Sequence, residues 1–305
     1  MSGSEVMSDF LLAHLSDPHL GPLPSPRLGE LMGKRAIGYF NWTRNRIGRH
    51  APHVLDAIVA DIKAQQPQHV AVTGDLVNIA LPQEFAMARS WLHSVGPPHD
   101  VTLVPGNHDA YVPATRNMFL RAWADYLTAD GASSVTFPFL RRRGPLALIG
   151  VSTAVPTAPL LATGKLGNTQ LSALGKLLAD LAREKDLFRV LLIHHPLQSL
   201  RPARYKRLID ADQVSALIRR HGVDLILHGH DHRHALTWIE GPANKKIPSL
   251  GVPSASAVAH GRSEPASYNL IRVSREAETW HCEVTVRGFT SRSHTIGEIG
   301  RRRLM

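Results

Sequence analysis

The segment Val101-Thr-Leu-Val-Pro-Gly-Asn-His-Asp109 joins a short apolar run to a polar turn. Residues Val101 to Val104 have the composition of a buried strand, which the following Pro-Gly pair ends. Beyond it, Gly106 permits a tight turn, Asn107 offers an amide oxygen and His108 offers an imidazole. We interpret the segment as a strand whose carboxyl end carries candidate ligands, because the strand ends of open α/β sheets are where ligands bind.

The same arrangement occurs twice nearer the N-terminus. A strand predicted over Phe10 to Ser16 leads to Asp17 and His19, and a strand predicted over His69 to Thr73 leads to Gly74-Asp75. Helices between these strands are predicted over Val54 to Gln65 and over Pro82 to Val95. Any one motif could be an ordinary polar turn, so the recurrence of ligands at strand ends carries the argument.

Two later strands end in histidine. The strand predicted over Phe188 to Ile193 leads into His194-His195, and the strand predicted over Asp224 to Leu227 leads into His228-Gly-His-Asp-His232. Alternation along a strand lets only one of the paired histidines face the centre. We expect His194 in that position and His195 as a hydrogen-bonded neighbour. His228 and His234 are expected to belong to the strand and its exit.

The candidate residues suit a pair of metal ions, because Asp, Asn and His side chains are common ligands of divalent transition metals. Asp17 and His19 lie two residues apart, so in extended backbone both leave on one face, and His230 and His232 repeat this spacing. The two oxygens of Asp75 can bridge ions about 3.5 to 4 Å apart. We expect His108 beside the reacting group, with its neighbour Asp109 fixing the imidazole tautomer.

The remaining elements complete an α/β pattern. Further helices are predicted over Arg116 to Leu127, over Thr169 to Arg183, and between a capping residue at Asp210 and a terminating Gly222. Further strands are predicted over Ser134 to Phe139, Leu146 to Val151, Leu236 to Ile239, Tyr268 to Val273 and Thr279 to Val286. We therefore predict two packed mixed β-sheets flanked by helices, a four-layer αββα sandwich.

In this order the motifs resemble those of the calcineurin-like metallophosphoesterase superfamily: Asp-x-His, Gly-Asp, Gly-Asn-His-Asp/Glu, His and Gly-His-x-His. The resemblance spans nearly the whole chain. Within the superfamily, His14-Leu-Ser-Asp-Pro-His19 and Gly164-Lys-Leu-Gly-Asn-Thr-Gln170 are similar to the class III cyclic-nucleotide phosphodiesterase branch.

The resemblance implies two divalent metal ions and their ligands. One would be held by Asp17, His19, Asp75 and His232, and the other by Asp75, Asn107, His194 and His230. It also implies that a metal-bridging hydroxide attacks phosphorus, while His108 stabilises the transition state or protonates the leaving oxygen. Members of the superfamily use manganese, iron or zinc, and this ligand set does not select among them.

Residues 22–50 depart from the superfamily pattern, because they exceed what a strand-to-helix connection needs. Apolar residues between Leu28 and Thr43 fall near helical spacing, and basic residues lie beside Trp42. We hypothesise a helical lid over the site. A peripheral packed helix and an interfacial membrane contact are the alternatives. We place the domain at residues 9–290, with flexible tails at 1–8 and 291–305.

Composition bounds the partners. The net charge of +10 favours a polyanion such as nucleic acid, anionic lipid or a phosphorylated substrate. Much of the excess lies in Arg141 to Arg143 and Arg301 to Arg303. These clusters predict either a membrane-surface or nucleic-acid contact or a generic solvated surface.

Two features bear on location. The single cysteine, Cys282, cannot form an internal disulfide, and the N-terminus lacks a secretory signal pattern, so we expect a cytoplasmic protein. The longest uncharged stretch, Pro145 to Gly164, contains prolines and glycine that argue against a membrane span.

Four functions are compatible with these residues. The leading hypothesis is a phosphodiesterase, with cyclic nucleotides as one substrate class. A pyrophosphohydrolase of UDP-sugar lipids, as in lipid A synthesis, would suit an apolar and basic insert, but its usual bacterial form has Arg at the position of His108. A nuclease would suit the charge, although no appended nucleic-acid module is visible. A non-enzymatic scaffold would have lost ligands, and this sequence retains them.

Overall fold

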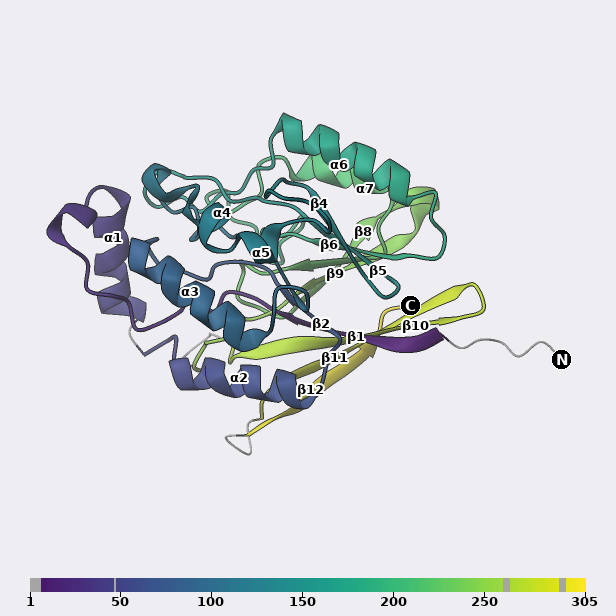
Figure 1. Ribbon diagram of the computed structural model, residues 1–305, viewed down its shortest axis with the longest axis horizontal. Helices are drawn as coiled ribbons and strands as arrows, with labels where there is room; N and C mark the ends of the chain where they lie inside the picture. The colour runs from purple at the N-terminus through teal and green to yellow at the C-terminus, as the bar shows by residue number, and fades with distance from the viewer. Residues whose placement is uncertain (1–6, 47, 260–263, 291–294) are drawn as a thin grey trace.

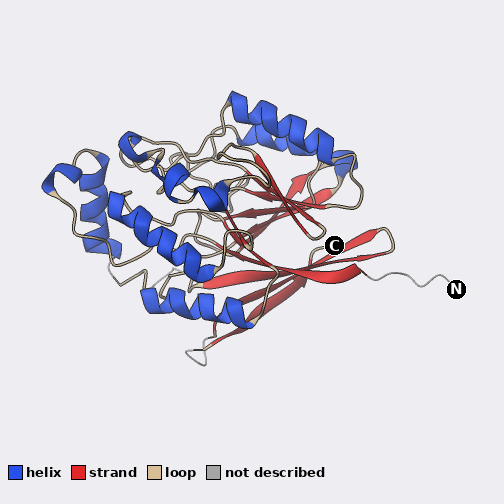
Figure 2. Ribbon diagram, viewed as in Figure 1, coloured by secondary structure: helices blue, strands red, loops and turns tan. Residues whose placement is uncertain are grey.

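The computed structural model of the protein describes residues 7–46, 48–259, 264–290 and 295–305. Two six-stranded sheets lie face to face, and helices cover the outer face of each (Figures 1 and 2). The predicted four-layer sandwich is confirmed. Each layer boundary has its own apolar core.

The first sheet has the strand order β12-β11-β10-β1-β2-β3. Its strands are β1 (Met7–Leu15), β2 (His69–Val72), β3 (Val101–Leu103), β10 (Ser267–Glu276), β11 (Thr279–Phe289) and β12 (Ile296–Arg303). Neighbours among β1, β2 and β3 pair in parallel, whereas β10, β11 and β12 continue the sheet as an antiparallel meander. The parallel part brings the ends of β1, β2 and β3 to one edge.

The second sheet has the order β4-β5-β6-β7-β9-β8. Its strands are β4 (Phe139–Arg143), β5 (Leu146–Gly150), β6 (Phe188–Leu192), β7 (Leu225–His228), β8 (Ala235–Glu240) and β9 (Lys246–Gly251). The four central strands pair in parallel, and β4 and β8 are antiparallel edges. The ends of β6 and β7 therefore also lie at one edge.

The helices follow the apolar spacing of the sequence. Helices α2 (Pro52–Ala64), α3 (Pro82–Val95), α4 (Met118–Ala122) and α5 (Ala124–Leu127) pack on the first sheet, and α6 (Asn168–Leu181) and α7 (Ala211–His221) pack on the second. In α2, Val54, Leu55, Ile58 and Ile62 form the buried stripe. Gly222 ends α7 with φ 77°, as predicted.

Two predicted elements differ, and one strand was not predicted. The strand expected over Ser134 to Phe139 begins instead at Phe139 and continues to Arg143. It buries Arg141 and Arg143 on alternate positions, where backbone carbonyls accept from them. The helix expected over Arg116 to Leu127 breaks at Trp123, which leaves helical geometry while its indole donates to the Phe85 carbonyl at 3.1 Å. β9, which contains Pro248, was not predicted.

The expected flexible tails and domain end at residue 290 are also wrong in part. Residues 296–303 form β12, which pairs antiparallel with β11. The Leu304 amide then donates to the Cys282 carbonyl at 2.8 Å, and the Leu304 side chain is buried. At the other end β1 begins at Met7, and residues 1–6 and 291–294 lie outside the described residues. The chain's C-terminal strand therefore belongs to the sandwich.

The segment 22–50 contains a short 3-10 turn (Leu28–Glu30), helix α1 (Lys34–Asn41) and a π-helical turn (Trp42–Arg46). Figure 1 shows α1 beyond one end of α3, outside the stacked layers. The uncharged stretch from Pro145 forms β5 and a loop, as expected. Among the described residues, no helix is both long and apolar enough to cross a membrane.

Candidate metal centre

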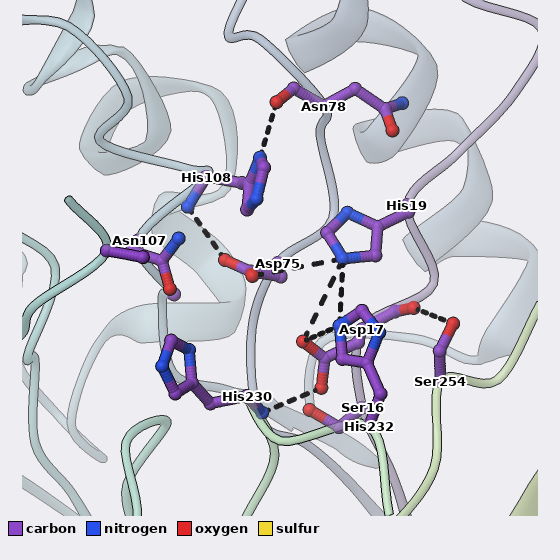
Figure 3. A network of polar contacts seen from close by, with 12 residues as sticks. Ser16, Asp17, His19, Asp75, Asn78, Asn107, His108, His230, His232 and Ser254 are labelled. Carbon is purple, nitrogen blue, oxygen red and sulfur yellow. Dashed lines mark hydrogen bonds and ion pairs between the residues drawn. The ribbon is translucent and has the colours of Figure 1, made fainter. Parts of the chain in front are cut away.

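The predicted ligands converge where strand ends of the two sheets face each other. They follow β1 (Asp17, His19), β2 (Asp75), β3 (Asn107), β6 (His194) and β7 (His230, His232). Figure 3 shows the Asp17, Asp75 and His232 side chains meeting at the middle of this cluster. Both sheets therefore contribute donors to one site.

A first group comprises Asp17, His19 and His232, whose donor atoms lie within 4.8 Å of one another. His232 Nε2 is 3.1 Å from Asp17 Oδ1 and 3.2 Å from His19 Nε2. Two donors that share a transition metal at about 2.1 Å are roughly 3 to 3.5 Å apart in octahedral or tetrahedral geometry. Two of the three spacings within this group thus suit one ion, and the third, between His19 Nε2 and Asp17 Oδ1, is 3.9 Å.

A second group comprises Asp75, His194 and His230. His194 Nε2 is 3.3 Å from Asp75 Oδ2 and 3.3 Å from Asn107 Oδ1. The same Asp75 oxygen lies 3.9 Å from His19 Nε2 of the first group. Asp75 therefore stands between the two groups, where a bridging carboxylate is required.

Backbone carbonyls set which ring nitrogen each histidine presents. His194 Nδ1 donates to the Thr73 carbonyl at 2.6 Å, and His19 Nδ1 lies 3.3 Å from the Val77 carbonyl. A ring N–H that donates to a carbonyl leaves the other nitrogen unprotonated and able to bind a metal. His230 is the reverse case, because its Nε2 lies 2.9 Å from the Lys206 carbonyl.

The backbone conformation at the ligand positions differs from the predicted one. The spacing argument assumed extended backbone, but Asp17, His19, Asp75, His230 and His232 all have positive φ, between 40° and 69°. The two histidines after β7 consequently separate, one to each group, rather than leaving on one face. This left-handed conformation costs roughly 1 to 2 kcal/mol for each residue other than glycine.

Glycine at two positions allows this crowding. A Cβ added to Gly106 would overlap the Asp75 carboxylate and approach His194 Cε1 at 2.7 Å. A Cβ on Gly229 would overlap Ser16 Oγ and the Asp17 carboxylate. Both glycines therefore permit close approach between a loop and a ligand.

His108 stands at the edge of the centre, in reach of His19 and Asp75. Its Nδ1 contacts the Asn78 carbonyl (Figure 3), and its ring stacks on Tyr111 with centroids 5.3 Å apart. Its backbone amide donates to Asp75 Oδ1 at 2.7 Å. With Nδ1 directed to a carbonyl, Nε2 is the nitrogen that can exchange a proton with a bound substrate.

Asp109 does not hold the His108 ring, contrary to the sequence prediction. Its carboxylate accepts backbone N–H bonds from Gly106 at 2.8 Å, from Asp75 and Leu76 at 2.9 Å, and from Val77 at 3.2 Å. Burial, and then the nearby Asp75 charge, raise the pKa of Asp109 to about 7. Asp109 therefore positions two ligand-bearing loops, and the Asn78 carbonyl orients His108.

The other histidines near the centre have structural partners. His195 contacts Thr153 Oγ1 at 2.6 Å and the Ala162 carbonyl at 3.1 Å, so the expected hydrogen-bonded neighbour is confirmed. Burial, and then the charge of His194, lower its pKa to about 3. His228 is buried at the end of β7, and His234 contacts Ser267 Oγ at 3.0 Å.

Sequence patterns missed two residues behind the first group. The His50 ring meets the His19 ring edge-on at 5.0 Å between centroids, and its Nδ1 is 2.8 Å from Ser256 Oγ. Ser254 Oγ donates to the Asp17 carbonyl at 2.6 Å. No motif flags these residues, because they lie at the end of the insert and in the connection after β9.

The insert docks beside His108. Lys34 Nζ lies 4.5 Å from the centroid of Tyr111, the ring that stacks on His108, and it donates to Thr157 Oγ1 at 2.6 Å. The buried Arg35 donates to the Ile79 carbonyl at 3.1 Å and to the Ala80 carbonyl. α1 is therefore anchored to loops that carry the site.

The field at the centre favours a cation. Burial opposes protonation of His194, but the charges of Asp75 and Asp17 outweigh burial and raise its pKa to about 10. Burial would raise the pKa of Asp75, yet His194, His108 and His19 hold it well below its usual range. Donor types, spacing and field all fit divalent metal ions.

Most arginines of the clusters that suggested a polyanion partner are buried or in ion pairs, whereas Arg302 and Arg303 are exposed. Arg141 is buried and donates to several backbone carbonyls, including that of Val101 at 2.8 Å. Arg142 pairs with Glu184 at 2.7 Å, and Arg143 pairs with Asp130 at 2.9 Å. Arg301 pairs with Glu298 at 2.7 Å.

Comparison with known proteins agrees with this geometry. The family model described as calcineurin-like phosphoesterase matches residues 10–234. No curated protein matches the chain.

Solved structures share the fold. A dimetal phosphatase from Danio rerio has a TM-score of 0.61 at 13% identity, covering 88% of this chain and 95% of that one. A purple acid phosphatase from yellow lupin (Lupinus luteus) seeds has 0.57 at 12% identity, covering 95% and 53%. A 5′-nucleotidase precursor from Thermus thermophilus has 0.51 at 16% identity, covering 91% and 54%. The chain spans about half the length of the latter two.

Proposed function

Because the chain belongs to the calcineurin-like phosphoesterase family, we propose that it is a metal-dependent phosphohydrolase of the phosphodiesterase type. The observation that carries the proposal is the convergence of Asp, Asn and His donors from both sheets around Asp75. One ion would be held by Asp17, His19, Asp75 and His232, and the other by Asp75, Asn107, His194 and His230. When bound, such ions neutralise phosphoryl oxygens and lower the pKa of a coordinated water.

The chain's own residues would handle the leaving group. We assign His108 Nε2 as the donor of a proton to the leaving oxygen, because Nδ1 is committed to the Asn78 carbonyl. Stacking on Tyr111 fixes the plane of the ring. Asp109 acts through the loops that it holds and is a positioning residue.

On its His108 side, this site suits a diester better than a monoester. A monoester carries a second negative charge, which calls for an additional cation at the site. Lys34 is a cation close to His108, but it is directed to Thr157 Oγ1 and to the Leu161 carbonyl at 3.1 Å. Burial lowers the Lys34 pKa to about 8, although the charge of Asp75 opposes that shift. A singly charged diester, cyclic nucleotides included, needs no such clamp.

Metal-reconstituted protein tests this function. The protein would be loaded separately with manganese, iron and zinc and assayed on bis(p-nitrophenyl) phosphate, p-nitrophenyl phosphate and cyclic AMP. We expect kcat/KM for the aryl diester to exceed that for the monoester by about tenfold or more, equivalent to at least about 1.4 kcal/mol in the transition state. Preference for the monoester, or no hydrolysis with any metal, would contradict the proposal.

The insert favours one further substrate class, a diphosphate linked to acyl chains. Leu28, Met32 and Phe40 are 93%, 74% and 57% exposed on the segment that docks beside His108. Leu160, 81% exposed, lies in the loop whose Leu161 carbonyl accepts from Lys34. Exposed apolar side chains near a phosphoester site can bind an acyl chain.

A lid role for the insert and its acyl specificity are tested together. The variant Leu28→Ser/Phe40→Ser would be compared with wild type on a lipid-linked nucleotide diphosphate and on its deacylated form. We expect KM to rise for the acylated substrate only. Ile299→Ser removes an apolar side chain that is 43% exposed elsewhere on the protein, and it serves as control. Equal KM changes for both substrates would rule out acyl binding by the insert.

For cellular location we propose the cytoplasm, because the sequence has a single cysteine, Cys282, which cannot form an internal disulfide. Burial, and then the charge of Asp224, raise its thiol pKa to about 12. A nuclease is not favoured, since Arg141 to Arg143, one of the two clusters that suggested nucleic acid, are all buried or in ion pairs.

A further inference from the structure

Unpaired positive charge remains beside the centre, in a hollow of about 850 Å³. Residues of the segment 196–212 form most of its lining, together with Asp231. We call this site the basic hollow, after its exposed side chains Arg201, Arg204, Lys206 and Arg207. Asp231 lies between the candidate ligands His230 and His232, so one wall of the hollow is shared with the metal centre.

The cations of the basic hollow lack acidic partners. Asp212 and Asp231 are the carboxylates in its lining, and Asp231 already accepts the Ser199 hydroxyl at 2.5 Å. Within the described part of the chain, none of the four cations is in an ion pair. This contrasts with Arg142 and Arg143, which are neutralised. Unpaired cations in a concave site attract an anionic ligand.

The backbone that carries these cations is fixed. The Tyr205 carbonyl accepts from Ala162 at 2.8 Å, the Arg207 carbonyl accepts from Gly164 at 3.1 Å, and the Ile209 amide donates to Gly164 at 2.9 Å. The Lys206 carbonyl is the partner of His230 Nε2. The loop is therefore tied to the neighbouring segment and to a candidate ligand of the second ion.

We propose that the basic hollow binds a second phosphate group of the substrate, so that preferred substrates are small phosphodiesters bearing a further phosphate. This inference rests on the proposed function, because it assumes that the scissile phosphate occupies the metal centre. The volume lies in the range of roughly 300 to 1,000 Å³ typical of small-molecule sites. Leu197 and Ile209 add apolar wall for the organic part of the substrate.

A matched pair of substrates isolates the second phosphate. They are thymidine 5′-(p-nitrophenyl phosphate) with and without a 3′-phosphate, which share the scissile group. Wild type, Arg204→Ala/Arg207→Ala and the control Arg219→Ala/Arg220→Ala would be compared with the same metals bound. The control removes two exposed arginines from the last turn of α7, outside the hollow lining.

We expect wild type and control to prefer the 3′-phosphorylated substrate by about tenfold in kcat/KM, as charge-assisted contacts to phosphate would give. In Arg204→Ala/Arg207→Ala the ratio should fall to near one. Calorimetry with thymidine 3′,5′-bisphosphate and thymidine 5′-phosphate should show the same loss of preference in binding, and it does not depend on turnover.

Four results would overturn the inference or its premise. Equal rates and equal binding of both ligands in wild type would refute the basic hollow while leaving the phosphodiesterase intact. A preference retained in Arg204→Ala/Arg207→Ala would place the second phosphate elsewhere. If neither ester is hydrolysed with any metal, the proposed function fails, and calorimetry alone decides whether the hollow binds phosphate. Salt-sensitive binding of single-stranded DNA that Arg204→Ala/Arg207→Ala abolishes, without preference for the bisphosphate, would assign the hollow to nucleic acid instead.

Discussion

His108 and Asp75 both lie beside the proposed substrate site, but their substitution is expected to have different effects. His108→Ala removes the proposed proton donor without removing a residue of the proposed ligand set, so turnover should fall by roughly 100-fold or more. Asp75→Asn removes the carboxylate shared by both groups, so metal and activity should be lost together.

Metal content by atomic absorption, measured beside kcat, separates these two outcomes. Full activity in His108→Ala would remove the acid role from this residue. Loss of metal in His108→Ala would instead identify His108 as a ligand. The donor atoms of His108, His19 and Asp75 are close enough for this outcome to be tested.

His14 should make the fold sensitive to acid. It is fully buried beside Thr73 Oγ1 at 3.0 Å, and burial, followed by the charge of His228, lowers its pKa to about 3. The unfolded chain takes up this proton below about pH 6.5, whereas the folded chain does so only near pH 3. The free energy of unfolding should therefore decrease as the pH is lowered through this window, by up to about 1.4 kcal/mol per pH unit from this group.

Denaturant unfolding of wild type, His14→Gln and His53→Gln from pH 8 to pH 4 checks this prediction. Other titrating groups are common to the three proteins and cancel in the differences. His14→Gln should show a shallower decline than wild type, and the exposed His53→Gln should not. Parallel declines in all three would show that His14 contributes nothing to acid sensitivity.

At the scale of elements, the insert should depend on Arg35 for its docking. The guanidinium of Arg35 donates to the carbonyls of Ile79 and Ala80, which lie in the loop after β2. Arg35→Ala should release α1, raise protease cleavage within residues 27–44, and slow hydrolysis of large substrates more than that of a small aryl diester. Arg44→Ala, whose guanidinium lies over Phe40 at 4.5 Å, is the control. Unchanged proteolysis and unchanged rates in Arg35→Ala would remove the lid hypothesis.

The same scale shows what sequence can predict. Strands with simple apolar runs, such as β1 and β6, were predicted because each is buried on both faces and needs no partner to be recognised. β4 could not be predicted, because two of its arginines, Arg141 and Arg143, are buried against backbone carbonyls of distant segments. β12 is rich in charge, and its place in the sheet depends on pairing with β11.

The residues of the site likewise divide into those that local sequence predicts and those that it does not. The ligand residues follow from motifs at strand ends, whereas the role of Asp109 depends on amides of residues 75–77, which only folding brings near. His50 and Ser254 support the first group through contacts between segments more than 200 residues apart. Long-range packing of this kind leaves no local pattern in a single sequence.

For the whole molecule, bound metal should act as a cross-link between the sheets. The first sheet supplies Asp17, His19, Asp75 and Asn107, and the second supplies His194, His230 and His232. Metal at 100 times its dissociation constant would stabilise the fold by about 2.7 kcal/mol for each site that the unfolded chain lacks.

Calorimetric melting with and without chelator checks this prediction. Removal of metal should lower Tm by roughly 5 °C for each such site, given about 2 °C per kcal/mol in a chain of this size. Tm should also rise with metal concentration in wild type, but not in Asp75→Asn. A Tm that is unchanged by chelator would show that bound metal does not stabilise the packing of the two sheets.

The left-handed backbone at five ligand positions also limits which substitutions this site can accept during evolution. At Asp17, His19, Asp75, His230 and His232 the backbone, independently of any metal, excludes β-branched residues and tolerates Asn, Asp, His and Gly. A descendant that abandoned catalysis could not simply drift to Val or Ile there without refolding its loops. Ligand residues should therefore be retained after catalytic activity is lost. Their presence in distant relatives would then reflect the conserved backbone conformation as well as retained activity.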